Sequence, residues 1–163
     1  NEPVVFRMWS TNLHEPLIGG QEAFQIVPDG RPYLIDLTNG TISESGPGDL
    51  RVWIRAAAQM VRGETYDWSC EVNAVNGGLL EQQQGVPMYR APAEGYVPSF
   101  KFQGRLKGGQ RGSPGERSFY VRLKDGQQYG AISIELWAPY NKQIPGLIRL
   151  AYTINPSGSR LLR

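Results

Sequence analysis

The sequence contains very few of the residues on which most catalytic and metal sites depend. It has one cysteine, Cys70, and one histidine, His14, among 163 residues. A single cysteine excludes a disulfide within the chain and any Cys-x-x-Cys motif. A Ser-His-Asp or Cys-His centre would need His14, which lies in the loop-like stretch STNLHEPLIGG. We expect an exposed loop histidine, an inert buried thiol, no metal site and no cofactor.

A strong excess of one charge and long apolar runs are also missing. The 17 basic and 15 acidic residues give a formal net charge of only +2. This balance does not point to nucleic acid, a membrane surface or a polyanion as an obligatory partner. No apolar run approaches the roughly 18 residues that a membrane-spanning helix needs. The sequence starts without methionine and shows no signal-peptide pattern, so we interpret it as a processed protein or a domain of a longer chain.

Several site motifs are incomplete. The glycine-rich stretch GGQRGSPG at 108–115 lacks the Lys-Ser ending of a phosphate-binding loop. The acidic residues are too scattered for a calcium-binding loop of the EF-hand type. Glu71 and Glu135 fall on outward positions of predicted strands. A glycosidase would need two carboxylates that converge in a cleft, which spacing alone neither predicts nor excludes.

The dominant positive signal is an alternation of apolar and polar residues. It is clearest in LRVWIRA at 50–56, where Leu50, Val52 and Ile54 fall on one face. The same pattern runs through residues 4–8, 66–72, 132–137 and 148–154. One apolar face and one polar face are typical of an antiparallel sheet that covers a single core.

The connecting stretches are rich in turn residues, because the chain contains 20 glycines and 12 prolines. Asp-Gly in residues 27–33 and again in 123–129 predicts a β-hairpin at each place. Further Asn-Gly turns occur in LTNGT and NAVNGGLL. Together with the alternating segments, these turns predict eight or nine short strands.

The one helix candidate is the stretch 49–63. Its first half alternates too strictly for a helix, so we predict a strand to about Ala56 and at most one helical turn at 57–61. Residues 41–49 and 103–117 are predicted to be irregular.

Residues 49–103 carry an ordered set of short motifs. Gly63, Tyr66 and Trp68 are followed by Gly77-Gly78, by YRAP at 89–92 and by Gly95-Tyr96. In order and spacing this segment resembles bacterial immunoglobulin-like domains of cell-surface and secreted proteins. The resemblance implies a β-sandwich without a disulfide, with Trp68 in its core and Cys70 in the place of a small apolar residue. It also implies that the Tyr96 hydroxyl anchors a strand corner.

The resemblance covers about a third of the chain, and residues 1–48 and 104–163 lie outside it. We therefore predict a single all-β domain over residues 1–163, built as an antiparallel two-sheet sandwich. It is either immunoglobulin-like with extra strands or a jelly roll. The final stretch NPSGSRLLR has the composition of a tail that leaves the domain.

Two groups of side chains are candidates for binding. The aromatic group is placed on outward strand faces or near strand ends and comprises Trp9, Trp53, Tyr120, Trp137 and Tyr140. Exposed aromatic rings stack on sugar rings or form protein–protein hot spots. The alternative is that this face is covered by another layer, by a second subunit or by arginine stems.

The second group is a basic loop in and around the irregular stretch 103–117. It comprises Lys101, Arg105, Lys107, Arg111 and Arg117. Such a loop would bind phosphate, a sulfated glycan or an acidic partner. The alternative is a solvated loop without a ligand.

Together these observations favour a non-catalytic binding or structural module of a bacterial envelope or secreted protein. Carbohydrate binding through the aromatic group is the sharper hypothesis, and protein–protein assembly, including an oligomer, is the broader one. The expected partner is then a glycan or a protein and not a nucleic acid. We also expect no membrane span. The expected location is extracellular, periplasmic or at the cell surface. The alternative function is a glycan-directed enzyme that uses a carboxylate pair.

Overall fold

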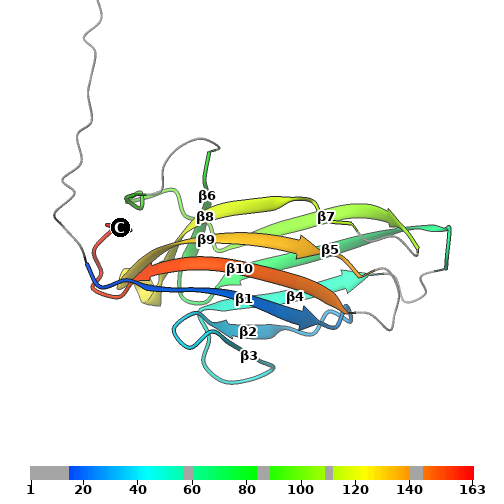
Figure 1. Cartoon of the computed structure of the whole chain (residues 1–163), viewed down its shortest axis with the longest axis horizontal. Coiled ribbons are helices and arrows are strands. Elements are labelled where there is room, and N and C mark those ends of the chain that lie inside the picture. Colours follow the sequence, from blue (N-terminus) through cyan, green and yellow to red (C-terminus); the bar gives the residue numbers. More distant parts are fainter. Residues whose placement is uncertain (1–14, 57–60, 84–88, 109–111, 140–144) are drawn as a thin grey trace, which may run out of the picture.

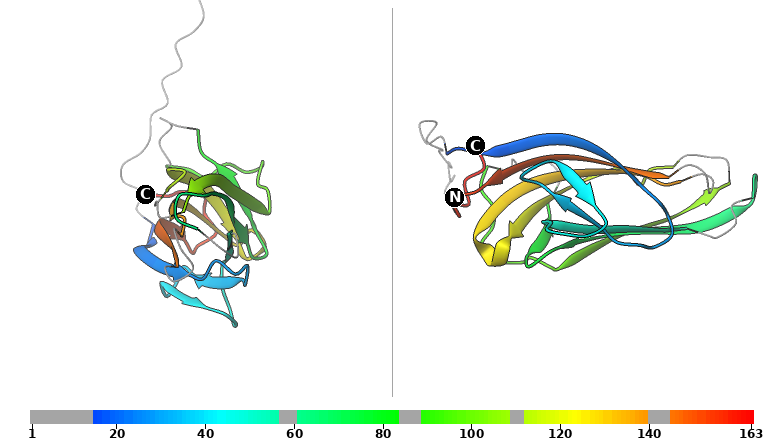
Figure 2. Two further views of the ribbon diagram at one scale, coloured as in Figure 1. Left: turned by 90° about the vertical axis from the view of Figure 1, so that its right-hand side faces the viewer. Right: turned by 90° about the horizontal axis from the view of Figure 1, so that it is seen from below.

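The computed structural model describes residues 15–56, 61–83, 89–108, 112–139 and 145–163. These residues form two antiparallel sheets of five strands each, with the strands running along the long axis of the molecule (Figures 1 and 2). The described residues contain no α-helix, and the one helical element is a 3-10 turn, η1 (Lys124–Gly126). The prediction of an all-β, two-sheet sandwich is confirmed.

The strands divide between a first sheet, sheet A, and a second, sheet B. Sheet A has the order β1-β10-β9-β8-β6, with bounds β1 (Ile18–Ile26), β10 (Gly146–Asn155), β9 (Gln128–Trp137), β8 (Glu116–Leu123) and β6 (Gly78–Glu81). Sheet B has the order β3-β2-β4-β5-β7, with bounds β3 (Thr41–Ser43), β2 (Tyr33–Asp36), β4 (Leu50–Ala56), β5 (Thr65–Ala74) and β7 (Ser99–Lys107).

The core lies between the two sheets and follows the alternation in the sequence. Leu50, Val52 and Ile54 of β4 are at most 1% exposed, and the alternate residues of β5, β9 and β10 are buried in the same way. Trp68 and Cys70 lie side by side on the inner face of β5, as predicted. The central strands of both sheets are therefore specified by local sequence pattern.

The two Asp-Gly turns have different outcomes. The turn within 123–129 joins β8 to β9 as a hairpin that closes at the pair Leu123 and Gln128, as predicted. The prediction of a hairpin at 27–33 is wrong, because this stretch passes from β1 in sheet A to β2 in sheet B. The turn forms, but the Gly30 amide donates to the Ile54 carbonyl, so the turn pairs with β4.

The prediction that residues 103–117 are irregular is also wrong at both ends. β7 continues to Lys107 and pairs with β5 over its whole length, and β8 begins at Glu116. Gly104 hides the alternation of β7 because it supplies no side chain at an inward position. The Trp68 indole takes that space, and a Cβ at residue 104 would lie 3.1 Å from its Nε1. Residues 44–49 lie outside the strands, as predicted, whereas 41–43 form β3.

The C-terminal stretch does not leave the domain. Residues 156–163 return over the outer face of sheet A, where Ala91 donates its amide to the Arg160 carbonyl and Leu162 donates to the Tyr89 carbonyl. Ala91, Tyr120 and Leu162 form a small second core there. The C-terminus lies at the end of the sandwich where β1 begins (Figures 1 and 2). This added layer covers one end of the outer face of sheet A, where it buries Tyr120.

Candidate functional site

The outward positions of β4, β5 and β7 form one continuous surface on sheet B, which we call the sheet-B face. The strand register places its side chains in cross-strand rows. One row is Trp53, Glu71 and Lys101, the next is Arg55, Ser69 and Gln103, and Asp67 and Arg105 follow. Because side chains alternate between the two faces of a strand, all of these residues point away from the core.

An open groove of about 670 Å³ crosses this face. Its polar lining comes from three strands and includes Arg55, Asp67, Ser69, Lys101, Gln103 and Arg105. Trp53 is not among the lining residues, but it lies two residues before Arg55 on β4 and in the same cross-strand row as Lys101. The sheet-B face therefore combines a groove of hydrogen-bond donors and acceptors with an aromatic side chain on the same face.

The sheet-B face is basic. Its outward positions carry the five basic residues Arg51, Arg55, Lys101, Arg105 and Lys107 and the two acidic residues Asp67 and Glu71. Arg105 Nε donates to Asp67 Oδ1 over 2.9 Å. Both side chains of this ion pair are more than 70% exposed, so the pair orients Arg105 and adds little stability. The hydrogen bond to Asp67 raises the pKa of Arg105, which keeps its charge.

The predicted aromatic group does not form a single platform. Trp53 lies half-buried on the outer face of sheet B, and Trp137 lies half-buried on the outer face of sheet A. Trp137 Nε1 is buried and has no hydrogen-bond partner among the described residues. The prediction of an exposed Tyr120 is wrong, because the ring is only 7% exposed beneath the C-terminal stretch. Trp9 and Tyr140 lie outside the described residues, as does His14.

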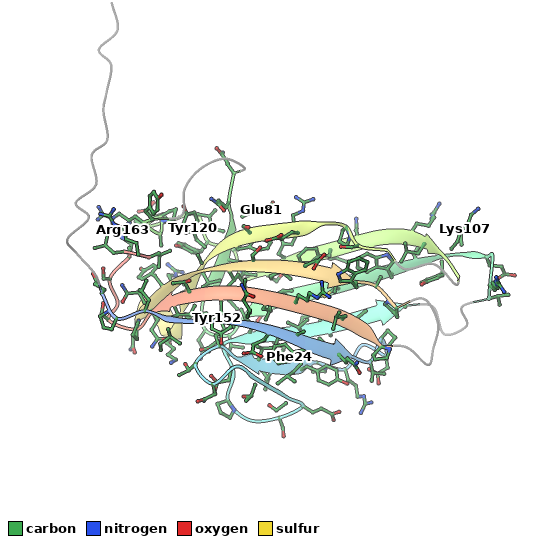
Figure 3. The ribbon with its side chains drawn as sticks, viewed as in Figure 1. Phe24, Glu81, Lys107, Tyr120, Tyr152 and Arg163 are labelled. Atoms are coloured by element: carbon green, nitrogen blue, oxygen red, sulfur yellow. The ribbon has the colours of Figure 1, made fainter. Side chains whose placement is uncertain are left out.

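The predicted basic loop is not a loop. Lys101, Arg105 and Lys107 are outward residues of β7, and Lys107 lies at the opposite end of the sandwich from Tyr120 and Arg163 (Figure 3). Arg117 belongs to β8 in sheet A, where its guanidinium bonds to Glu81 over 2.7 Å. Arg111 lies outside the described residues. Three of the five predicted cations therefore share a face with Trp53, a combination that sequence reasoning missed.

The two carboxylates considered from the sequence do not converge. Glu71 lies on the outer face of sheet B and Glu135 on the outer face of sheet A, so the whole sandwich separates them. Glu135 instead has Glu116 as its direct cross-strand partner. Both line a second groove, of about 380 Å³, in which Ser133 donates to Glu116 and Arg149 bonds to Glu135 over 3.2 Å. Sequence analysis missed Glu116 because it placed residue 116 in an irregular stretch.

In the part of the chain that the structure describes, no three His, Cys, Asp or Glu side chains gather closely enough to hold a metal ion. The described residues also include no helix with the length and apolarity to cross a membrane.

Cys70 is a core residue, and its chemistry follows from burial. It is 1% exposed on β5, and burial, with a smaller contribution from Glu71, raises the pKa of its thiol to about 12. A thiol held in this way is neutral and is a poor nucleophile near neutral pH.

This burial predicts a specific pH dependence of stability. The thiol ionises near its ordinary pKa of 9.0 in the unfolded chain but stays protonated in the folded chain up to about pH 12. The unfolded state therefore binds fewer protons in this window, and stability is lost as the pH rises. We expect Cys70 to lower the free energy of unfolding by roughly 1.4 kcal/mol between pH 8 and pH 10. Guanidinium unfolding of the wild type and Cys70→Ala at both pH values measures this, and an equal loss in both proteins would contradict it.

The comparisons with known proteins identify no relative of this chain. A scan against protein-family models, a search of curated proteins and a search of solved structures each found no match.

Proposed function

We propose that this chain is a non-catalytic binding module whose sheet-B face binds carbohydrate. The observation that carries the proposal is the placement of Lys101 and Gln103 in an open groove, with Trp53 in the same cross-strand row as Lys101. A sugar ring presents an apolar face, which stacks on an aromatic side chain, and a rim of hydroxyl groups, which bond to polar side chains. The sheet-B face offers both within two neighbouring cross-strand rows.

The proposed setting is a secreted or cell-surface protein with an immunoglobulin-like sandwich. Two features support it. Trp68 is 5% exposed and packs in the core, where the resemblance expects a tryptophan. The Tyr96 hydroxyl donates to the Pro92 carbonyl over 3.0 Å, a bond to backbone a few residues upstream like that of a tyrosine corner.

Tryptophan fluorescence with acrylamide quenching tests the proposal. The purified protein is titrated with a panel of soluble oligosaccharides, and we expect at least one to protect a quenchable tryptophan population. In Trp53→Ala the protection should be lost and the affinity should fall by at least tenfold, since about 1.4 kcal/mol corresponds to tenfold and buried aromatic anchors contribute more.

Trp137→Ala is the matched control, because it removes a half-buried tryptophan from the other sheet. It should bind as the wild type does. If no oligosaccharide changes the spectrum, the chain does not bind carbohydrate and a structural module is the better interpretation. If both variants lose affinity equally, the sheet-B face is not the binding site.

A second candidate function has one observation in its favour. Glu116 and Glu135 face each other in the groove on sheet A. Directly opposed residues in an antiparallel pair have Cβ atoms about 4.5–5.5 Å apart, so these two side chains can place their carboxyl groups at the roughly 5–10 Å separation that glycoside hydrolysis requires. If the chain is a glycan-directed enzyme, it should release reducing ends from the same oligosaccharides. Glu135→Gln should stop that release and Glu71→Gln should not.

A further inference from the structure

The charge of the protein is concentrated on the proposed binding face. The sheet-B face holds an excess of three positive charges, whereas the whole chain has a formal net charge of +2. The residues outside this face therefore sum to a formal charge of −1, so the net positive charge of the protein resides on the sheet-B face. A ligand that binds here meets a local positive field that the overall composition conceals.

The cations surround the aromatic ring. On β4 the outward residues are Arg51, Trp53 and Arg55, and each step of two residues advances about 7 Å along a strand. Lys101 lies in the row of Trp53 two strands away, at about 10 Å for a strand spacing near 4.8 Å. Trp53 thus has arginines before and after it on β4, and Lys101 lies beyond Glu71 in the same cross-strand row.

Two cations of the sheet-B face, Arg55 and Arg105, have defined contacts. The side chain of Arg55 packs over Gly30 in the connection between β1 and β2, where a Cβ would lie 2.9 Å from Arg55 Nε. Arg105 is oriented by its bond to Asp67. Orienting a side chain before binding reduces the conformational entropy lost when the ligand arrives.

From this arrangement we propose that the carbohydrate bound by the sheet-B face is an anionic polysaccharide carrying carboxylate or sulfate groups. This inference rests on the proposed function and names its ligand class. A sugar ring lies on Trp53, and acidic groups of the neighbouring units pair with Arg55, Lys101 and Arg105. Charge-assisted hydrogen bonds of this kind are about twice as strong as neutral ones.

The acidic residues on the sheet-B face should favour an anionic polysaccharide over a nucleic acid. Glu71 lies between Trp53 and Lys101, and Asp67 lies beside Arg105. A nucleic-acid backbone presents only acceptors and closely spaced charge, so two carboxylates inside its footprint oppose it. A glycan also presents hydroxyl donors, and carboxylates accept from those.

The test compares a polygalacturonate hexasaccharide, a heparin hexasaccharide, the neutral oligosaccharide cellohexaose and a 20-base-pair DNA duplex by isothermal titration calorimetry at 50 and 200 mM salt. We expect at least one acidic hexasaccharide to bind at least tenfold more tightly than cellohexaose, with an affinity that falls as salt rises. Binding of polygalacturonate would show that carboxylates suffice, and binding of heparin alone would show that sulfate is needed, because heparin carries both groups. The double variant Arg55→Gln/Lys101→Gln should lose this preference while retaining the thermal unfolding midpoint.

The matched control is Arg117→Gln/Lys124→Gln, which removes the same charge from β8 and the turn after it. It should keep the preference for the acidic ligand. Equal binding of neutral and acidic ligands that still depends on Trp53 would overturn this inference and leave the proposed function intact. Binding of no oligosaccharide would reject both. DNA binding as tight as that of the acidic glycans and unaffected by Trp53→Ala would show a simple charged surface and overturn the inference.

Discussion

Replacing Phe119 by alanine is expected to lower the free energy of unfolding by about 3–5 kcal/mol, the usual cost of truncating a fully buried phenylalanine. Phe119 belongs to β8 and is not exposed. Its ring meets two rings of β7 edge to face, with centroids 4.9 Å from Phe100 and 6.4 Å from Phe102. This aromatic cluster packs sheet A against sheet B, so removing the Phe119 ring should weaken the packing of both sheets.

The cavity left by Phe119→Ala cannot close easily, because the backbone of β8 is paired with β9 on one side and with β6 on the other. Thermal unfolding should show a midpoint lower by roughly 10 °C, since a chain of this size loses about 2–4 °C per kcal/mol. Phe119→Leu keeps most of the volume and should cost less than about 1.5 kcal/mol. Similar losses in the two variants would show that the cluster does not connect the sheets in the way described.

The second large effect is expected at Asn155, whose side chain is fully buried at the end of β10. Its Nδ2 donates to Glu15 and to the Leu161 carbonyl, and its Oδ1 accepts from the Ser157 amide and hydroxyl. Asn155→Leu keeps the size of the side chain and removes these bonds. We expect a loss of about 2–4 kcal/mol, because the Leu161 carbonyl and the Ser157 amide lose their partner and each such group costs about 1–3 kcal/mol.

Asn155→Leu should also release residues 156–163 from sheet A, which gives a readout separate from stability. Trypsin should cut after Arg160 much faster in the variant than in the wild type under conditions where both remain folded. Asn39→Leu is the control, because it makes the same replacement at an exposed asparagine, which bonds to Asp36 in the connection between β2 and β3. An unchanged cleavage rate in Asn155→Leu would mean that the C-terminal stretch is held by its contacts with Ala91 and Tyr120 alone.

The replacements at Phe119 and Asn155 should affect binding differently from Trp53→Ala. Phe119 packs on the inner side of β7 and Asn155 lies at the end of β10, so neither contributes a side chain to the sheet-B face, and their replacement should weaken binding mainly through loss of folding. Trp53→Ala should act in the opposite sense, with a large loss of affinity and a small loss of stability, because its side chain lies at the surface. Measuring stability and affinity in all three variants separates the scaffold from the binding surface.

The sequence by itself determined the fold class and much of the core. Alternation within β4, β5, β9 and β10 identified the strands and their inward faces, and it placed Trp68 and Cys70 together in the core. This was possible because the face that a side chain occupies depends only on its position along its own strand.

The tertiary structure decided which strands are neighbours, and with them the candidate site. Trp53, Lys101 and Gln103 meet only because β4, β5 and β7 pair in one register over about fifty residues of sequence. The same kind of pairing set Glu116 opposite Glu135. Gly104 concealed β7 because a glycine adds nothing to an apolar pattern, and Tyr120 pointed outward but was covered by a third layer. Register and covering layers depend on contacts between residues far apart in the chain, and no local pattern encodes them.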